Sequence, residues 1–294
     1  MSFEIFGAHL FLPLFSVRDP TSWGVRLSFL LPPPRTMLGA LARGVGIISG
    51  VASGEEKLRE EIIRNILTYA FEAYSFATVR PLSPLIKSSQ ILRYVPPVEK
   101  GEREKTPQEA HDAFKTEIIF STEMKVIFFV NMESVNNIFQ KYGLPRINTE
   151  KLCYATRLID RVGPTEAMCY TKNVEQLKIK EVCSAINTYV PHGWLEEAKG
   201  EYCVGELLPN LRVLESLGQI RQTNIKNIQD EDLRRKKILY LFPLRLTKGP
   251  KGREVFEASE LKVKLKAGYE AYLLNDGTEV AIPALEGNPA LTGE

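Results

Sequence analysis

The chain has 294 residues, of which 44% are hydrophobic and 25% are charged, and its net charge at pH 7 is +2. This composition is that of a globular protein and excludes a disordered or fibrous chain, and the length allows one large domain or two smaller ones. No apolar run is long enough to span a membrane and no signal sequence opens the chain, so we expect a cytoplasmic protein without membrane contact.

The cysteines and histidines are too scattered for a metal site or a disulfide framework. The four cysteines lie far apart without a CxxC motif, and the three histidines form no pair at metal-ligand spacing. We therefore expect no metal and no cofactor.

The first 175 residues predict strands and helices in alternation. Strands are expected at residues 2–12, 25–31, 86–95, 117–120, 125–130 and 167–170. Helices are expected at residues 37–42, 55–74, 107–115, 134–142 and 149–159. The order matches the βαββαβ unit of ferredoxin-like and RRM-like domains, with an arm inserted at about residues 85–120.

Short strands dominate the rest of the chain, residues 176–294. They are expected at 178–183, 186–190, 237–246, 254–265, 269–274 and 280–283. Asn275, Asp276 and Gly277 form a good hairpin turn between the last two. We therefore predict an α+β fold: an RRM-like domain at residues 1–175 with its arm, followed by a β-rich region at 176–294.

A proline-rich corner precedes the first predicted helix. Pro32 to Pro34 end the strand, Arg35 follows, and Thr36 is a good N-cap for a helix that Gly44 and Gly46 end or interrupt. Free backbone amides, the positive end of the helix dipole and a guanidinium would meet there, which predicts a phosphate site. The alternative is a stiff loop before a helix that merely packs.

The charges are unevenly distributed. Residues 20–54, 73–98 and 233–253 contain no acidic residue but several lysines and arginines. If folding brings these segments together, they would form a surface for a polyanion. The alternative is a solvated surface with uneven charge.

Single-stranded RNA binds to aromatic faces and cations, and the acid-free stretch of residues 73–98 supplies both. A second option is cleavage of RNA without a metal, through general acid–base chemistry on a 2′-hydroxyl group. The candidates for that chemistry are His9, His111, Tyr94 and Lys87.

Three motifs resemble the CRISPR-associated Cas-five family. Residues 30–44, Leu-Leu-Pro-Pro-Pro-Arg-Thr-Met-Leu-Gly-Ala-Leu-Ala-Arg-Gly, are similar to the proline-rich turn and Thr-x-x-Gly helix of that family. Residues 161–168 resemble its Arg-Leu-Gly-x-x-Glu segment, and residues 112–117 are a weaker match at the base of the arm. The resemblance covers roughly the first 170 residues, and the first motif is the most specific.

The resemblance implies a RAMP-superfamily protein and a non-catalytic subunit of a type I Cascade complex, most like the archaeal type I-A branch. It implies binding of the 5′ handle of CRISPR RNA and contact with Cas-seven backbone subunits and the large Cas-eight subunit. Target DNA would be met only indirectly, through the complex. The alternative is a metal-independent endoribonuclease that processes precursor CRISPR RNA. We predict RNA contacts from Arg26, Arg35, Thr36, Arg43, Arg80, Lys87, Arg93, Tyr94 and Arg161.

Overall fold

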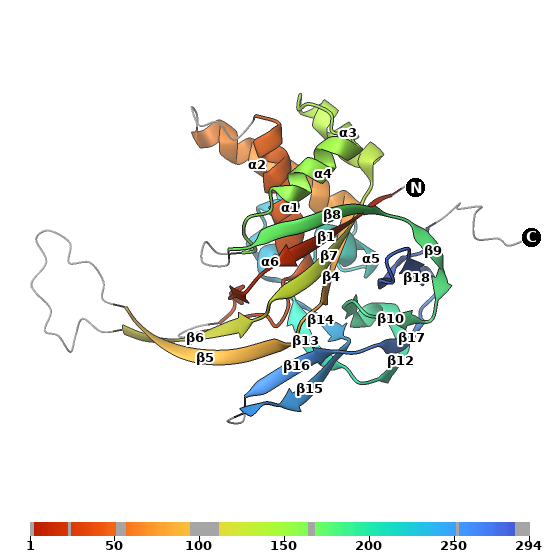
Figure 1. The fold of residues 1–294 in the computed structure, drawn as a ribbon. Helices are drawn as coiled ribbons and strands as arrows, with labels where there is room; N and C mark the ends of the chain where they lie inside the picture. The colour runs from red at the N-terminus through yellow and green to blue at the C-terminus, as the bar shows by residue number, and fades with distance from the viewer. Residues whose placement is uncertain are drawn as a thin grey trace, which may run out of the picture.

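The computed structural model describes residues 3–22, 25–50, 57–94, 112–163, 168–250 and 253–285. Within these ranges, the side chains of residues 25, 57–59, 92–94 and 112–114 are not described. The fold is a mixture of helices and antiparallel sheets (Figure 1). No helix among these residues is long and apolar enough to cross a membrane.

The central element is a four-stranded antiparallel sheet with strand order β4-β7-β1-β8. Its strands are β1 (Glu4–Phe11), β4 (Ser75–Pro81), β7 (Glu123–Val130) and β8 (Tyr170–Leu177). In strand β1, the side chains of Phe6, Ala8 and Leu10 are at most 1% exposed. These three side chains share one face of the strand, which is therefore the face that the helices cover.

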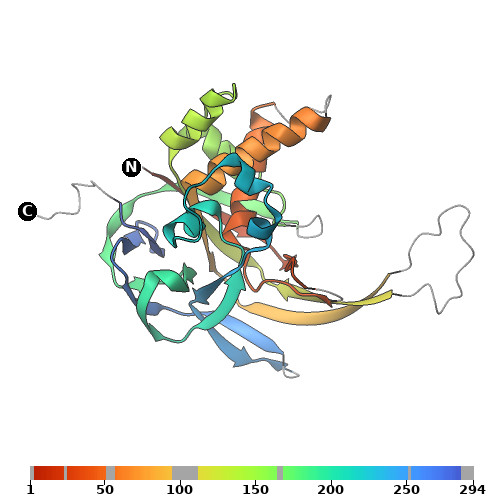
Figure 2. The same cartoon turned by 180° about the vertical axis from the view of Figure 1, so that it is seen from behind.

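Four helices lie beside that face, above the sheet in Figures 1 and 2, and α1 passes behind β8 in Figure 1. They are α1 (Pro34–Ile48), α2 (Lys57–Tyr74), α3 (Met132–Lys141) and α4 (Thr149–Arg157). The predicted helices at 55–74, 134–142 and 149–159 are thus confirmed to within a few residues.

Helix α1 corrects the prediction for residues 25–46. It runs through Gly44 and Gly46, and it begins at Pro34 rather than after Thr36. Proline suits the first helical turn because its missing N–H has no intrahelical partner there. Gly44 does not end the helix but permits close packing, because a Cβ at this position would lie 2.2 Å from the backbone oxygen of Ala155 in α4.

The predicted strand at 25–31 shrinks to β3 (Val25–Arg26). After β3, Ser28 makes an isolated bridge to Arg18, and Phe29 and Leu31 turn into the core at 6% and 1% exposure. Their apolar character serves the core rather than a strand.

A second, six-stranded sheet carries the arm. Its order is β15-β16-β5-β6-β2, and β3 pairs with β6. The bounds are β2 (Leu14–Phe15), β5 (Leu85–Tyr94), β6 (Asp112–Phe120), β15 (Leu244–Lys248) and β16 (Glu254–Ala258). The hairpin of β5 and β6 projects from the body, as expected of an arm (Figure 1). The helix predicted at 107–115 is wrong for residues 112–115, which belong to β6, and residues 107–111 lie outside the described residues.

The remaining chain forms three small sheets, with orders β10-β17-β12, β11-β14-β13 and β19-β18-β9. Their strands are β9 (Ile179–Cys183), β10 (Ala185–Ile186), β11 (Val190–Pro191), β12 (Leu195–Gly200), β13 (Cys203–Leu207), β14 (Ile238–Phe242), β17 (Leu261–Leu265), β18 (Tyr269–Leu274) and β19 (Glu279–Pro283). The turn at Gly277 joins β18 to β19 with φ of 80°, as predicted. Strands β12 and β13 were not predicted, nor were helices α5 (Leu211–Ser216) and α6 (Glu231–Arg235) and the 3-10 helices η1 (His192–Trp194) and η2 (Ile225–Ile228).

One hydrophobic cluster runs through both halves of the chain, from Ile5 to Ile282. Phe76 of β4 meets Trp194 edge to face at 6.2 Å between ring centroids, and Thr78 donates a hydrogen bond to the backbone oxygen of Tyr189. The C-terminal sheets therefore cover part of the face of the central sheet that the helices leave open.

Candidate nucleic-acid interface

The proline corner is closed rather than open. Pro32, Pro33 and Pro34 are buried, and the N-cap of α1 is Pro33, without a side-chain cap. The prediction that Thr36 caps the helix is therefore wrong. The Arg35 side chain is 15% exposed and is fixed at two points: Nε lies 2.9 Å from Oε2 of Glu72, and Nη1 donates to the backbone oxygen of Leu233 at 2.9 Å.

Glu72 is the buried partner in this arrangement. Burial raises the pKa of its carboxyl group, and the opposing effects of Arg35 and of the backbone amide of Leu211 do not cancel that rise. Because Glu72 belongs to α2, Arg35 to α1 and Leu233 to α6, this contact joins three helices. We call Arg35, Glu72 and the Leu233 carbonyl the arginine clasp.

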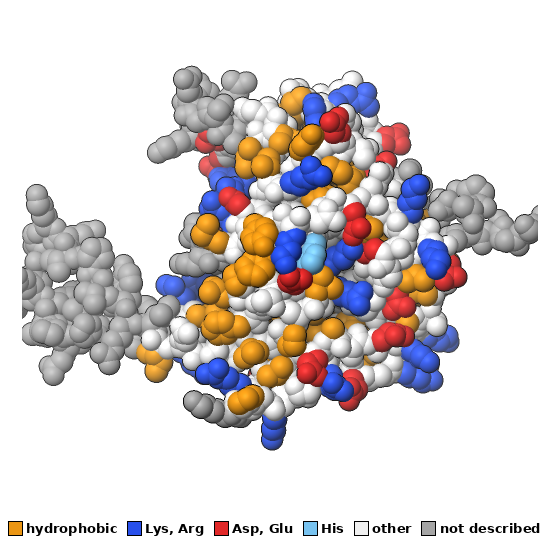
Figure 3. Space-filling model, viewed as in Figure 1, with side chains coloured by type: hydrophobic (Ala, Val, Ile, Leu, Met, Phe, Trp, Pro, Cys, Tyr) orange, Lys and Arg blue, Asp and Glu red, His pale blue; other side chains and the backbone are white. Residues whose placement is uncertain are grey.

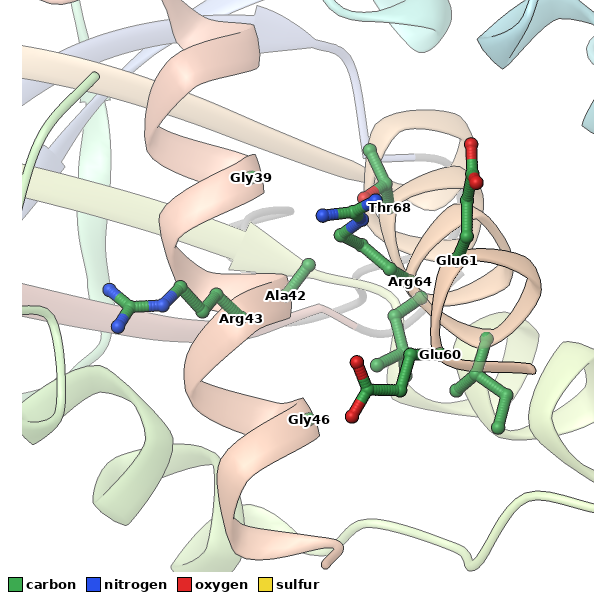
Figure 4. A pocket seen from close by; sticks show the side chains of 10 residues that line it. Gly39, Ala42, Arg43, Gly46, Glu60, Glu61, Arg64 and Thr68 are labelled. Carbon is green, nitrogen blue, oxygen red and sulfur yellow. The ribbon is translucent and has the colours of Figure 1, made fainter. Parts of the chain in front are cut away.

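Arg43 and Arg161 converge on a single carboxylate. Nη1 of Arg43 donates a hydrogen bond to Oδ1 of Asp160 in an ion pair, and Nε of Arg161 lies 3.4 Å from the same oxygen. Burial alone would raise the pKa of Asp160, but hydrogen bonds from both arginines lower it overall. Arg43 also lies on the rim of a hollow of about 580 Å³ between α1 and α2, where Figure 4 shows it pointing away from α2 while Arg64 reaches toward α1.

The predicted residues of the arm are described only in part. Arg26 is exposed in β3, and Nζ of Lys87 in β5 pairs at 3.0 Å with Glu117 of β6. Glu117 also accepts a hydrogen bond from the backbone N–H of Ser28. The side chains of Arg93 and Tyr94 lie outside the described residues, although both belong to β5.

The three acid-free segments do come together. The segment of residues 73–98 contains β5, whose residues 85–87 pair with residues 254–256 of β16. Strand β16 follows the segment of residues 233–253 and pairs with β15 of that segment. The first segment reaches the same sheet through β3, and it meets the third again where Arg35 binds Leu233. The segments therefore approach one another, but Glu117, Glu254 and Glu257 on the intervening strands face or pair with their cations. The use of these segments for a polyanion stays a prediction.

The uncovered part of the central sheet carries an aromatic pair that was not predicted. Phe11 of β1 and Tyr170 of β8 lie 5.1 Å apart between ring centroids, and Tyr170 is 54% exposed. Figure 3 shows this side of the molecule, where apolar side chains lie among lysines, arginines and a histidine. We call Phe11, Tyr170, Lys172, His9 and Arg80 the sheet platform.

Lys172 reaches the platform because β8 is irregular. Thr171 pairs with Leu10 and Asn173 with His9, so Lys172 is an extra residue in the ladder, a β-bulge. Its Nζ lies 5.5 Å from the centroid of the Phe11 ring, within the range of a cation–π contact. Lys172 also binds Glu123.

The carboxylates of Glu123 and Asp276 bind the basic side chains on this face of the sheet. Hydrogen bonds from Lys172 and then His9 lower the pKa of Glu123, and Nε2 of His9 lies 2.8 Å from its Oε2. Lys125 of β7 binds Asp276 of the turn after β18. Arg80 makes a long hydrogen bond of 3.5 Å to the Gly277 oxygen beside it. This pairing holds the basic groups in fixed positions on this face of the sheet, and Lys172 is the one shown to contact a ring among the described residues.

The platform has the chemistry to hold a single strand of RNA. Exposed aromatic rings stack on bases irrespective of sequence, and lysine and arginine beside them bind phosphates. Of the candidates for cleavage, His9 lies on the platform, Lys87 is paired with Glu117, and His111 and the Tyr94 side chain lie outside the described residues.

The two-residue period of a strand places His9 and Phe11 on the same face of β1. Because Phe6, Ala8, Leu10 and Leu12 point to the helices, His9 and Phe11 must point to the opposite face. No local signal identifies Tyr170 and Lys172, because their place beside Phe11 depends on the pairing of β8 with β1.

Comparison with known proteins identifies relatives in one group. The chain is 27% identical over 191 residues to the CRISPR-associated protein Cas5 of Methanocaldococcus jannaschii, covering 65% of this chain and 71% of that protein. It is 26% identical over 183 residues to CRISPR system aCascade subunit Cas5 1 of Saccharolobus solfataricus, covering 59% of this chain and 65% of that subunit. No family model matches the chain. The two relatives confirm the resemblance predicted from the motifs.

A solved structure of similar fold is the crystal structure of a CRISPR protein from Archaeoglobus fulgidus. It matches with a TM-score of 0.50 and 14% sequence identity over 96% of this chain and 100% of that chain. At this identity the match concerns the fold alone, and it supports a mixed α/β fold shared with a CRISPR protein.

Proposed function

We propose that this chain, a member of the Cas5 (Cas-five) family, is a non-catalytic subunit of a Cascade complex and holds the 5′ handle of the CRISPR RNA. The curated relatives support the assignment to a CRISPR system, since one of them is named a subunit of aCascade. Its partners would be Cas-seven backbone subunits and the large Cas-eight subunit, in an archaeal complex of type I-A.

The observation that carries the RNA-binding proposal is the sheet platform. The succession of elements supports an RRM-like reading: β1, helices α1 and α2, β4, the arm, β7, helices α3 and α4, then β8. In RRM domains, aromatic side chains on the face of such a sheet stack on RNA bases. Phe11 and Tyr170 lie on this face of the sheet, and Lys172 lies over the Phe11 ring. Arg80 lies on the same face, two strands away on β4.

We place the handle across the platform and along the arm. Arg80 and Lys87 lie on this path, and Arg26, Arg93 and Tyr94 continue it on β3 and β5. Arg35 and Thr36 belong to α1, in the layer of helices behind the sheet, so a nucleotide stacked on Tyr170 would not reach them (Figures 1 and 2).

Replacing Tyr170→Ala and Lys172→Gln together tests this proposal. Loss of one stacking ring costs about 1–3 kcal/mol per base, so affinity for handle RNA should fall at least fivefold. The matched control is Tyr154→Ala with Arg157→Gln, because Tyr154 of α4 is 51% exposed and the Arg157 guanidinium carbon lies 5.8 Å from its ring centroid. Fluorescence anisotropy with labelled handle RNA measures both. Equal affinity of the two variants would refute the platform.

A cleavage assay separates this function from the endoribonuclease alternative. The full chain is incubated with repeat RNA in EDTA, and the products are resolved on a denaturing gel. We expect intact RNA. Cuts at one site that disappear in His9→Ala would establish the enzyme instead, because His9 is the candidate general acid–base group on the platform.

A further inference from the structure

A hollow of about 360 Å³ behind the central sheet is lined by four arginines. Arg18 comes from the segment after β2, Arg35 from α1, and Arg234 and Arg235 from α6. Pro20, Leu208 and Glu231 complete the lining. We propose that this arginine hollow binds the phosphate group of a nucleotide, at a site separate from the sheet platform.

Arg35 is prepared for such a ligand by the arginine clasp. Glu72 holds its Nε and the Leu233 carbonyl holds its Nη1, whereas Nη2 makes no hydrogen bond within the described part of the chain. The guanidinium is planar and rigid, so fixing two nitrogens also fixes the third. Binding a phosphate oxygen there costs little side-chain entropy, and the hydrogen bond is charge-assisted.

The charge balance of the hollow fits a phosphate. Arg35 is neutralised by Glu72, and Nη2 of Arg235 lies 3.3 Å from Oε2 of Glu231. Among the described residues, neither Arg18 nor Arg234 has a carboxylate within the 4.0 Å of an ion pair. Arg234 acts on Glu72 only at longer range, so both arginines can still form a direct ion pair with a ligand. Two such cations suit a phosphate monoester, which carries about −1.5 to −2 at pH 7.

The neighbouring space fits the rest of a nucleotide. Arg35 and Arg234 also line an adjoining hollow of about 550 Å³, whose other lining residues include Asn65, Asn227 and Gln229. Amide side chains both donate and accept hydrogen bonds, as the edges of bases and the hydroxyl groups of sugars require. A phosphate in the first hollow would thus leave its sugar and base beside polar groups.

The hollow lies on the opposite side of the central sheet from the platform. Helix α6 and the beginning of α1 stand behind the sheet in Figure 1 and in front in Figure 2. A phosphate in the hollow therefore belongs either to a free nucleotide or to an RNA strand. In an RNA strand, the nucleotide in the hollow is a different one from any that stacks on Tyr170. Its existence does not depend on the proposed handle site.

The double variant Arg18→Gln with Arg234→Gln tests the proposal without leaving a carboxylate unpaired. Its control is Arg146→Gln with Arg157→Gln, two exposed arginines outside the hollow whose loss changes the net charge equally. The full chain is titrated with pyrophosphate, ATP and an eight-nucleotide RNA by calorimetry at several salt concentrations. We expect at least tenfold weaker binding of one or more probes in the hollow variant and less than a twofold change in the control.

The probes identify the source of the phosphate. Binding of ATP or pyrophosphate that is lost in the hollow variant supports a free nucleotide. Binding of RNA alone supports a strand, and the slope of log K against log salt should then become shallower by about 0.7, for the loss of one phosphate contact. The proposal is overturned if no probe binds, or if the hollow variant binds every probe like its control. Loss of RNA binding only in Tyr170→Ala with Lys172→Gln would then assign the RNA to the platform. The latter result would leave the handle site intact.

Discussion

Replacing Arg35→Met should destabilise the fold by leaving the Glu72 carboxylate buried without its partner. The Glu72 side chain is 3% exposed, and the clasp joins α1, α2 and α6. Removing one partner of a buried ion pair costs about 3–5 kcal/mol, and the Leu233 carbonyl loses its hydrogen bond as well. Since many domains are stable by only about 5–15 kcal/mol, this is a large fraction of the total.

The loss should depend on pH in a defined direction. Burial already raises the pKa of Glu72 above its usual 4.5, and removal of the Arg35 cation raises it further. When folding raises the pKa of a group, the folded state binds a proton that the unfolded state has already lost. The stability of the folded state therefore falls as the pH rises from the unfolded pKa to the folded pKa. Arg35→Met should therefore be less destabilised at pH 5 than at pH 7.

Urea unfolding of the full chain at pH 5 and pH 7 measures both effects. Glu72→Gln combined with Arg35→Met removes the buried charge, so the double variant should recover part of the loss and show little extra pH dependence. A loss below about 1 kcal/mol for Arg35→Met, equal at both pH values, would refute the clasp as a buried ion pair.

Two further perturbations test packing and pairing. Gly44→Ala should cost about 1–3 kcal/mol, because its Cβ would lie 2.2 Å from the Ala155 oxygen, whereas Gly39→Ala in the same helix meets nothing within 4 Å and should stabilise by about 0.5–1 kcal/mol. Thermal unfolding separates them, and equal melting temperatures would contradict the close contact of α1 and α4. Burial alone would raise the pKa of Asp276, but hydrogen bonds from Lys125 and Thr278 lower it overall. The ionised Asp276 therefore stabilises the folded state above its unfolded pKa of 3.8, and this stabilisation is lost as the pH falls through the folded pKa. Asp276→Asn should thus have a lower free energy of unfolding than wild type at pH 7, and this free energy should fall less on acidification, as measured by urea unfolding. An equal fall in both proteins would exclude a stabilising Asp276–Lys125 pair.

The apolar residues within 2–12 predicted the first strand, and the periodic apolar residues of 55–74 predicted α2, because these signals are local. The arm was predicted for a similar reason, since residues 99–106 are dense in charge, lie between two β-like segments and do not suit a core. The proline corner was interpreted wrongly. Thr36 resembles an N-cap, but the helix already starts at Pro34 because a proline in its first turn needs no N–H partner.

By itself the sequence determined the first strand, helices α2, α3 and α4, the acid-free segments and the motifs that resemble the Cas5 family. Tertiary structure alone decided what those residues touch: Arg35 meets Leu233 across 198 positions, and Lys172 reaches Phe11 through a bulge in strand pairing. The physical reason is the separation along the sequence of the residues that interact. Helix and strand signals arise from neighbours a few positions apart, whereas burial, ion pairing and ring contacts are set by which distant segments the core brings together.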